Sequence, residues 1–253
     1  MSVIDKFNDP SFGLWGKDKM IKKLQSSLKN SHSKSQIRRM LGDTYALQRH
    51  RVMNLAMKRK LYRHISATSP LQSVQIDLGF LPQLRSPLNN NNIGFIVFID
   101  VFSRYLWVKP LTNRKQMHIK VKEMINEMKR DFGKKPTHMT ADNEFATLEL
   151  QRLVARELDG RLWLSEPHEK FRTGIVERVI RTLKNLIKRY LTQYNTTKYI
   201  DVLPILVKNY NNTVHSFTNV TPEYAIRTGK RNVNWKSKKI PKLKKMSDPL
   251  TYL

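Results

Sequence analysis

Cysteine is absent from this sequence of 253 residues, which excludes disulfide bonds and every zinc site that has cysteine ligands. A metal ion would have to be held by carboxylates or histidines, which favours a hard cation such as Mg²⁺. Long apolar runs are also absent. The longest spans residues 93–99, far below the ~20 residues that cross a bilayer, so we expect no membrane partner. The first residues, MSVIDKFNDP, lack the basic and apolar regions of a signal peptide, and we expect an intracellular protein.

Acidic residues are scarce: 20 Asp and Glu stand against 47 Lys and Arg, which gives a net charge of +27. A compact chain with this charge repels itself unless a polyanion neutralises it. Nucleic acid is the polyanion that such basic proteins most often bind. The composition therefore predicts a nucleic-acid partner, and it makes the position of each acid informative.

One of these acids lies in a basic amphipathic segment, residues 166–191, with the sequence EPHEKFRTGIVERVIRTLKNLIKRYL. A helix advances about 100° per residue, so one charged stripe carries Glu177, Arg181, Lys184 and Lys188. A separate apolar stripe carries Val176, Ile180, Leu183, Ile187 and Tyr190. The predicted helix has one side to bury and one charged side. Taken alone, Glu177 and Arg181 could be a surface ion pair worth about 0.3–0.5 kcal/mol.

Two further acids belong to segments with the pattern of buried strands. In SVQIDLGF the apolar residues alternate, which places Asp77 on the opposite face together with Gln75 and Gly79. In THMTADNEF, Asp142 follows a short strand at its carboxyl end, where the sites of such sheets usually lie. Either aspartate alone could simply accept hydrogen bonds from the backbone. With Glu177 they form a candidate group of three carboxylates.

The other periodic segments alternate between strand and helix patterns, which predicts an α/β domain with a mixed sheet. Residues 93–100 and 105–111 flank a turn and are typical of an antiparallel hairpin. A methionine-rich stripe over 117–132 predicts a helix that covers the sheet, with methionine as core filler. Residues 81–92, rich in Pro and Asn, predict a mobile surface loop. The remaining expected elements are a helix over 148–158, a strand over 161–165 and a helix over 199–211.

The N-terminal segment, residues 1–69, carries 15 Lys and Arg against 4 Asp and Glu, and it predicts a basic helical module. A helix over 19–28 is followed by a polar turn in which Ser33 or Ser35 can cap a second helix over 36–51. This order is typical of a helix-turn-helix-like DNA binder, whose basic residues include Arg38 and Arg39. Basic helical hairpins also occur in scaffolds, so that alternative stays open.

The opposite end of the chain, from Arg227 to Leu253, is basic and has no hydrophobic periodicity. It predicts a tail that binds phosphates, serves as a localisation signal or is disordered. Residues 57–70 predict a charged linker into the first strand. The three histidines of the N-terminal segment are not expected to bind metal, because no cysteines at matching spacing accompany them. Those expected at the surface or beside phosphates are His32, His50 and His64, and those expected in structural or loop positions are His168 and His215.

Three carboxylates that converge would repel one another and raise each other's pKa unless cations lie between them. Two Mg²⁺ ions about 3.5–4 Å apart can bind both the attacking and the leaving oxygen of an in-line phosphoryl displacement. Such chemistry needs no covalent protein nucleophile. The basic stripe that follows Glu177 could bind a phosphate backbone along the same helix.

The ordered series of motifs resembles the catalytic core of retroviral-type integrases, members of the RNase H-like DDE recombinases. The resemblance covers roughly residues 70–230 and rests on QIDLG, FIDVFSRYLWVKPL, TADNEF, TGIVERVIRTLKNLIK and YNNTVHSFTNVTPEYAIRTGK. The preceding KNSHSKSQIRRMLGDTYALQRHR is most similar to integrases of Maverick or Polinton DNA transposons and of virophages. The resemblance implies an RNase H-like mixed five-stranded sheet with flanking helices, preceded by the small helical module.

The resemblance implies that Asp77, Asp142 and Glu177 form a metal-binding catalytic triad for Mg²⁺ or Mn²⁺. The implied reactions are removal of nucleotides from the DNA 3′ ends of an element and attack of the new 3′-hydroxyls on target DNA. Arg181 and Lys184 match basic residues that contact DNA ends, and Lys188 continues their stripe. The residues that match the flexible loop beside the active site include His168, Lys170 and Arg172. Such enzymes bridge two DNA ends as multimers, so we expect a homo-oligomer, a dimer or tetramer on DNA, in a nucleus or viral factory.

Three departures from the retroviral pattern matter. The 34 residues between Asp142 and Glu177 are one fewer than in that pattern, a change that a loop can absorb. A His-His-Cys-Cys zinc domain cannot exist without cysteine, so recognition of the DNA end would fall to residues 1–69 or to the basic tail, residues 231–253. A C-terminal barrel domain is also not evident. Two other functions stay open: an RNase H-like metal nuclease that does not join DNA, and a catalytically silent DNA-binding protein.

Overall fold

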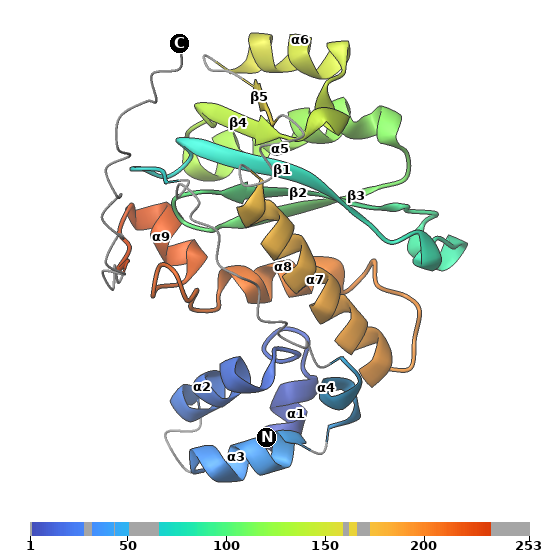
Figure 1. Ribbon diagram of the computed structural model, residues 1–253, viewed down its shortest axis with the longest axis vertical. Coiled ribbons are helices and arrows are strands. Elements are labelled where there is room, and N and C mark those ends of the chain that lie inside the picture. Colours follow the sequence, from blue (N-terminus) through green and yellow to red (C-terminus); the bar gives the residue numbers. More distant parts are fainter. Residues whose placement is uncertain are drawn as a thin grey trace, which may run out of the picture.

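A mixed five-stranded sheet forms the centre of the computed structural model, which describes residues 2–27, 32–42, 44–50, 66–158, 162–165 and 173–233. The strands are β1 (Ser73–Phe80), β2 (Gly94–Asp100), β3 (Leu106–Leu111), β4 (His138–Ala141) and β5 (Leu162–Leu164). Their spatial order is β3-β2-β1-β4-β5 (Figure 1). Strands β1, β2 and β3 pair antiparallel, whereas β4 and β5 continue the sheet in parallel. This is the RNase H-like arrangement that the motifs imply.

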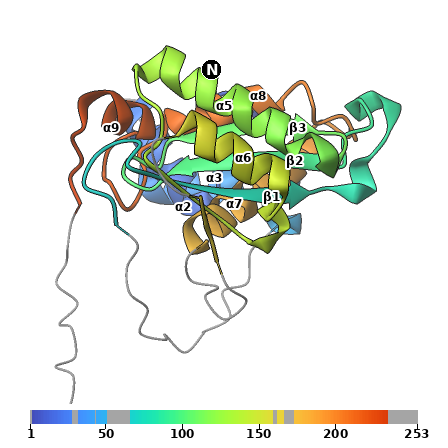
Figure 2. The ribbon, with the colours of Figure 1, turned by 90° about the horizontal axis from the view of Figure 1, so that it is seen from above.

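Helices cover both faces of this sheet (Figure 2). One face carries α5 (Met117–Phe132) and α6 (Leu148–Glu157). The other carries α7 (Gly174–Gln193) and α8 (Leu203–Asn211), and α9 (Pro222–Thr228) follows α8. Within the described ranges, no helix is both long and apolar enough to span a bilayer.

Among the described residues, the alternation of side chains along the strands produces two large hydrophobic cores, one on each face of the sheet. Val74, Ile76 and Leu78 of β1 pack with the apolar stripe of α5 and with α6. Alternate residues of β2, among them Phe95 and Val97, pack instead against α7 and α8. The prediction that Val74, Ile76 and Leu78 share one buried face of β1 is therefore confirmed. The prediction that the methionine stripe belongs to the core is also confirmed, since Met117, Met124 and Met128 are buried.

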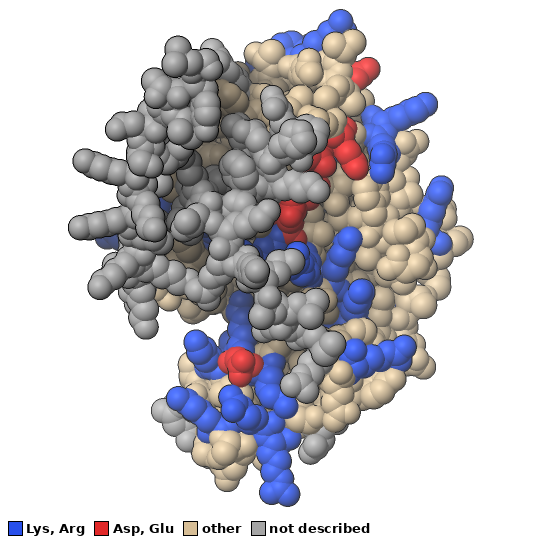
Figure 3. Space-filling view, viewed as in Figure 1, with Lys and Arg blue, Asp and Glu red and all other residues tan. Residues whose placement is uncertain are grey.

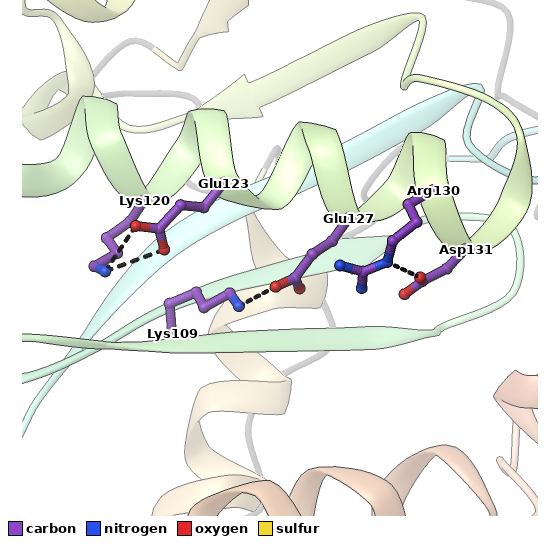
Figure 4. A network of polar contacts seen from close by, with 6 residues as sticks. All are labelled: Lys109, Lys120, Glu123, Glu127, Arg130 and Asp131. Atoms are coloured by element: carbon purple, nitrogen blue, oxygen red, sulfur yellow. Dashed lines mark hydrogen bonds and ion pairs between the residues drawn. The ribbon is translucent and has the colours of Figure 1, made fainter.

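Ion pairs along the exposed edge of α5 tie this helix to the neighbouring strand (Figure 4). Lys109 of β3 donates to Glu127 of α5, and this pair is only partly exposed. Lys120 pairs with Glu123 at 3.0 Å within the helix. Gly133 ends α5 at φ 68°, a left-handed conformation that glycine adopts without steric cost.

The described part of the N-terminal segment forms four short helices, α1 (Val3–Asn8), α2 (Lys17–Ser27), α3 (Lys34–Gly42) and α4 (Tyr45–Arg49). The single helix predicted over 36–51 was wrong, because α3 ends at Gly42 and α4 begins at Tyr45. Glycine weakens a helix interior, which favours a break there. Ser33 is the cap of α3: its hydroxyl accepts from the Gln36 N–H at 3.2 Å. Helix α1 was not predicted, since its apolar pattern consists of little more than Val3 and Phe7.

These four helices share a hydrophobic core with α7 and α8. Buried polar contacts cross the same boundary. Arg189 of α7 donates through Nη1 to the Leu14 carbonyl at 3.0 Å, and the Trp15 indole donates to Asn209 of α8 at 3.1 Å. The described part of the N-terminal module is therefore packed onto the sheet domain. The division into residues 1–69, 70–230 and 231–253 stays a prediction.

Local contacts add to or correct three predictions. Most of the loop 81–92 is exposed, as predicted, but Asn89 is fully buried within it and donates to the Leu84 and Thr197 carbonyls at 2.8 and 2.9 Å. The mobility of this loop stays a prediction. The predicted start of helix α8 was wrong: the helix begins at Leu203 rather than Tyr199, with Pro204 in its first turn, where proline is favoured. Arg231, the first residue of the predicted tail, donates to the Phe102 and Ala67 carbonyls at 3.1 and 2.8 Å. The rest of the predicted tail, residues 234–253, lies outside the described residues, as do residues 51–65 of the predicted linker and its surroundings.

Candidate active site

Asp77 lies on the central strand β1, which has a neighbouring strand on each side. It pairs in register with Val97 of β2, and its Oδ1 accepts a hydrogen bond from the Leu78 N–H at 2.7 Å. The side chain is half-buried. A central strand thus holds one carboxylate at a fixed height on the face that carries α7.

Asp142 follows the end of β4, the parallel neighbour of β1. The register pairs Gln75 with Thr140, and two residues further along the two strands come Asp77 and Asp142. The Asp142 carboxylate accepts from the Glu144 N–H at 3.0 Å and caps a short 3₁₀ turn, Asn143–Phe145. Parallel pairing therefore carries two of the predicted acids to one end of the sheet.

Glu177 belongs to the first turn of α7, and the Thr173 hydroxyl donates to its Oε1 at 2.9 Å. The start of this helix is tied to the sheet by Gln75, whose Oε1 accepts from the Val176 N–H at 3.0 Å. Gln75 is fully buried and lies on β1, two residues before Asp77. The sequence placed Gln75 on the face of Asp77 but gave it no role, because nothing in the pattern shows which backbone group it meets.

The charges of the three acids act on one another. Burial, with a smaller contribution from the charges of Asp142 and Glu177, raises the pKa of Asp77 to about 7, against the hydrogen bond from the Leu78 N–H, which lowers it. Burial also raises the pKa of Asp142, to which the charges of Glu144 and Glu177 contribute. Mutual repulsion is the condition that a bound divalent cation relieves.

The three side chains have the chemistry of metal ligands, but their arrangement is not that of a ready metal site. All three side chains offer carboxylate oxygens, the donors that Mg²⁺ prefers. In the described part of the chain, however, no three acidic or histidine side chains approach closely enough to form a ready ligand group. The Glu177 carboxylate is turned toward Thr173, at the border of residues 166–172, which lie outside the described residues. Those residues include three predicted to line the active site, His168, Lys170 and Arg172.

A fourth carboxylate, Glu144, lies close to the three predicted ones. Its charge contributes to the raised pKa of both Asp77 and Asp142. Glu144 is itself paired with Arg114 at 3.7 Å, and the Arg114 guanidinium lies 4.6 Å from the centre of the Phe80 ring. The motif TADNEF contains Glu144, but its partner, thirty residues earlier, could be found only in the fold.

The predicted basic stripe continues along α7 from Glu177. Arg181 and Lys188 are exposed and Lys184 is half-buried. Burial and the charge of Lys188 lower the pKa of Lys184, while the charge of Asp77 opposes this shift, so Lys184 lies beside the acidic group. Figure 3 shows a patch of Asp and Glu near the start of α7, with Lys and Arg gathered below it along the helix.

The other predicted residues lie away from the acids. Arg38 and Arg39 are exposed on α3, and Arg38 pairs with Asp18 at 3.3 Å. His50 makes a 2.7 Å hydrogen bond with the Thr192 hydroxyl, which gives it a structural role. His215 accepts through Nδ1 from the Phe217 N–H at 3.1 Å, consistent with the structural position expected for it. His64 lies outside the described residues.

No family model matches the sequence. Over 130 residues the chain is 32% identical to a protein of Caenorhabditis elegans described as uncharacterized and transposon-derived. This match covers 50% of the chain and 44% of the relative, so the chain spans less than half the length of that protein.

Solved structures give a second comparison. The chain is similar to one from the cryo-EM structure of the simian T-cell lymphotropic virus intasome in complex with the PP2A regulatory subunit B56 gamma. The TM-score is 0.55 at 17% identity, and the match covers 97% of this chain and 80% of that one. The HTLV-2 integrase catalytic core in complex with magnesium gives a TM-score of 0.47 at 19% identity, over 63% of this chain and 97% of that core. At these identities the likeness concerns the fold. The fold of this chain is thus similar to that of a chain in this intasome complex, and half of its sequence is similar to a transposon-derived protein.

Proposed function

We propose that this protein is a metal-dependent DNA integrase that processes the 3′ ends of a transposon or viral DNA and joins them to target DNA. The observation that carries the proposal is the placement of Asp77 on β1, Asp142 just after the parallel strand β4 and Glu177 in the first turn of α7, which Gln75 ties to β1. Burial first, and then the charges of the other two acids, raise the pKa of Asp77 to about 7. Three acids that repel one another in a protein with few acids destabilise the fold, and a function that needs their combined charge accounts for them.

In this proposal the three carboxylates hold two Mg²⁺ or Mn²⁺ ions. When bound, the ions lower the pKa of a water or 3′-hydroxyl and stabilise charge on the phosphate that is attacked. The chain itself supplies the positions: Gln75 fixes the start of α7 relative to β1, and Lys184, beside Asp77, binds the DNA phosphate next to the one that reacts. Arg181 and Lys188 extend the phosphate contacts along α7.

The wider assignments rest on the same proposal. Exposed Arg38 and Arg39 on α3 are available to bind the DNA end. His168, Lys170 and Arg172 are proposed to line the active site. The fold shared with an intasome chain and the similarity to a transposon-derived protein support an assembly of several copies on DNA, a dimer or tetramer. An origin in Maverick or Polinton transposons or virophages, and a location in a nucleus or viral factory, remain proposals from the sequence motifs.

A strand-transfer assay tests the function. A short duplex with a recessed 3′ end is incubated with labelled target DNA and Mg²⁺ or Mn²⁺, with wild-type protein and with Asp142→Asn in parallel. We expect joined products from the wild type and none from the variant. Glu149→Gln, which changes an exposed acid on α6, serves as the matched control and should join DNA normally.

The other outcomes separate the two alternatives. Cutting without joining would identify a nuclease of the same fold. Binding of DNA without either reaction, equal in wild type and in all three triad variants, would identify a silent DNA-binding protein.

A further inference from the structure

A basic pocket lies beside α7, on a different side of this helix from the three acids of the candidate active site. Its volume is about 370 Å³, and it is bounded by the N-terminal segment, the turn after β2, α7 and the segment after α8. The residues that define its chemistry are Lys19, Arg104, Arg178, Asn185, Arg189 and His215. Three of these residues lie on α7: Arg178, Asn185 and Arg189. Each comes one position after a residue of the stripe formed by Glu177, Lys184 and Lys188, so this helix presents two separate polar faces.

The described residues that line this pocket carry positive charge without any acid: they include four Lys and Arg and no Asp or Glu. Asp100 is the one acid whose charge reaches Arg104, but its carboxylate already accepts from the Leu71 N–H and from the Ser103 N–H and hydroxyl. Among the described residues, the cations of this pocket therefore have no acid that bonds to them directly.

Arg104 shows this most clearly. Its side chain is only 6% exposed, it lies 4.4 Å from the centre of the Phe217 ring, and its buried Nη1 has no hydrogen-bond partner among the described residues. Arg189 likewise has a buried Nε without a partner among them. Arginine does not lose its proton in proteins, so a buried donor of this kind is costly unless an acceptor binds it.

The backbone adds a second cost at the same residue. Arg104 adopts φ 66° in the turn after β2, a left-handed conformation in which Gly or Asn is favoured. A residue that is both strained in the backbone and buried with an unpaired charge points to a role for its side chain.

The other groups around Arg104 are donors as well. His215 accepts at Nδ1 from the Phe217 N–H, so the neutral ring carries its proton on Nε2 as a further donor. Lys19, Arg104 and Arg178 line the same pocket as this ring. Burial, together with the charges of these three cations, lowers the pKa of His215 to about 3. Several donors that converge on one small space fit an anion with several acceptor oxygens.

We propose that this pocket binds a phosphate group, with Arg104, Lys19 and Arg178 as its cationic ligands. The donors suit the oxygens of a phosphate. A neighbouring, larger pocket of about 840 Å³ shares Lys19 and Arg189 and extends the basic surface to Arg38. The phosphate could therefore belong to a nucleic-acid backbone or to a small free phosphate ester.

Calorimetric titration of the full chain with inorganic pyrophosphate tests the site, at an ionic strength held constant with sodium chloride. Two variants remove ligands: Lys19→Gln, and Arg104→Asn, which keeps a residue that tolerates the left-handed backbone. Lys22→Gln, an exposed lysine of the same helix as Lys19 that does not line the pocket, is the matched control. We expect pyrophosphate affinity to fall about tenfold or more in both pocket variants and to stay at the wild-type value in Lys22→Gln.

Binding of a short DNA duplex to the same proteins distinguishes the sources of the phosphate. If DNA supplies it, both pocket variants also lose DNA affinity, and pyrophosphate competes with the duplex. If a free ester supplies it, DNA affinity stays unchanged while pyrophosphate binding is lost. Both results support the site. Absence of pyrophosphate binding by the wild type, or equal binding by wild type and both pocket variants, would overturn it, whatever the strand-transfer assay shows.

Discussion

At the scale of single residues, the candidate site combines acids whose charges repel one another and so lower the stability of the folded state. Asp77 is half-buried on the central strand and faces other carboxylates, so its ionised form is disfavoured in the folded state. The sequence singled out three candidate acids, because acids are few, Asp77 and Asp142 belong to segments with the pattern of buried strands, and Glu177 lies in a basic helix. It could not show Glu144 or Gln75, whose roles depend on Arg114 and on the backbone of Val176, far away in the chain.

Asp77→Asn is expected to stabilise the metal-free protein at high pH. The pKa of Asp77 is raised to about 7 in the folded state from the ordinary aspartate value of 3.8, so folding is penalised as pH rises from about 4 to 7, and the penalty is fully present above 7. Thermal unfolding in chelator should give a higher Tm for the variant than for wild type at pH 8, and little difference near pH 4. Glu149→Gln should show no such pH-dependent gain. A lower Tm for Asp77→Asn at pH 8 would contradict the argument.

The metal provides a second test at the same site. Added Mg²⁺ should raise the Tm of the wild type, because an ion that binds only the folded state stabilises it. It should raise the Tm of Asp77→Asn much less, since one ligand charge is missing. Equal shifts in the two proteins would place metal binding elsewhere.

Glu177→Gln is expected to abolish cleavage and joining while DNA affinity stays the same or rises. The substitution removes the negative charge of one metal ligand and leaves Arg181, Lys184 and Lys188 unchanged on their stripe. Cleavage on a labelled duplex, with affinity measured in parallel, checks both parts. A variant that still cuts at the wild-type rate would remove Glu177 from the triad.

At the scale of elements, α7 organises the molecule. Its apolar stripe packs on the sheet, its first turn carries Glu177, and its last turns contact the N-terminal helices. The helix and its stripes were predicted from periodicity. Its second polar face, with Arg178 and Arg189, was not, because only the partners packed against a helix show which of its polar residues share a pocket.

Gln75→Leu is expected to lower strand transfer by about tenfold or more without lowering DNA affinity. The substitution leaves the buried Val176 N–H unpaired, which costs about 1–3 kcal/mol, and it loosens the position of Glu177 relative to Asp77. Gln75→Glu, which can still accept from that N–H, should retain more activity than Gln75→Leu. Equal loss in the two variants, or a loss of DNA binding, would argue against a positioning role.

Lys184→Glu is expected to weaken binding of the DNA end and to reduce its salt dependence. Each phosphate contact that is lost removes about one unit from the slope of log affinity against log salt concentration. Fluorescence anisotropy over a range of salt concentrations gives this slope. Lys122→Glu, a change of charge on α5 on the other face of the sheet, is the control and should leave the slope nearly unchanged. A slope equal to that of wild type would exclude the Lys184 contact.

At the scale of the whole molecule, the N-terminal helices and the sheet domain share one of the two cores. Asn209 stands at the centre of their contact: it accepts from the Trp15 indole and the Lys23 ammonium and donates to the Pro10 carbonyl. A module that is packed in this way moves with α7, so DNA bound to α3 would be held in a fixed relation to the acids.

The shared core predicts a single cooperative unfolding transition for the described helices and sheet. Asn209→Ala should lower the free energy of unfolding by about 2–4 kcal/mol, because several buried groups lose their partner. The exposed neighbour Asn212→Ala should change it little. Urea unfolding followed by tryptophan fluorescence and by circular dichroism checks this. Two separate transitions would show that the N-terminal helices fold independently of the sheet domain.

The sequence by itself determined the order of strands and helices, the faces of β1 and α7, the basic charge and the three candidate acids, because these depend on local periodicity and on the rarity of acids. Tertiary structure decided what depends on distant partners. It broke the predicted helix at Gly42, buried Asn89 in a loop expected to be mobile, joined the N-terminal helices to α7, and enclosed Arg104 in a second basic pocket. Hydrogen bonds and packing between segments far apart in the chain set these features, and no local pattern encodes them.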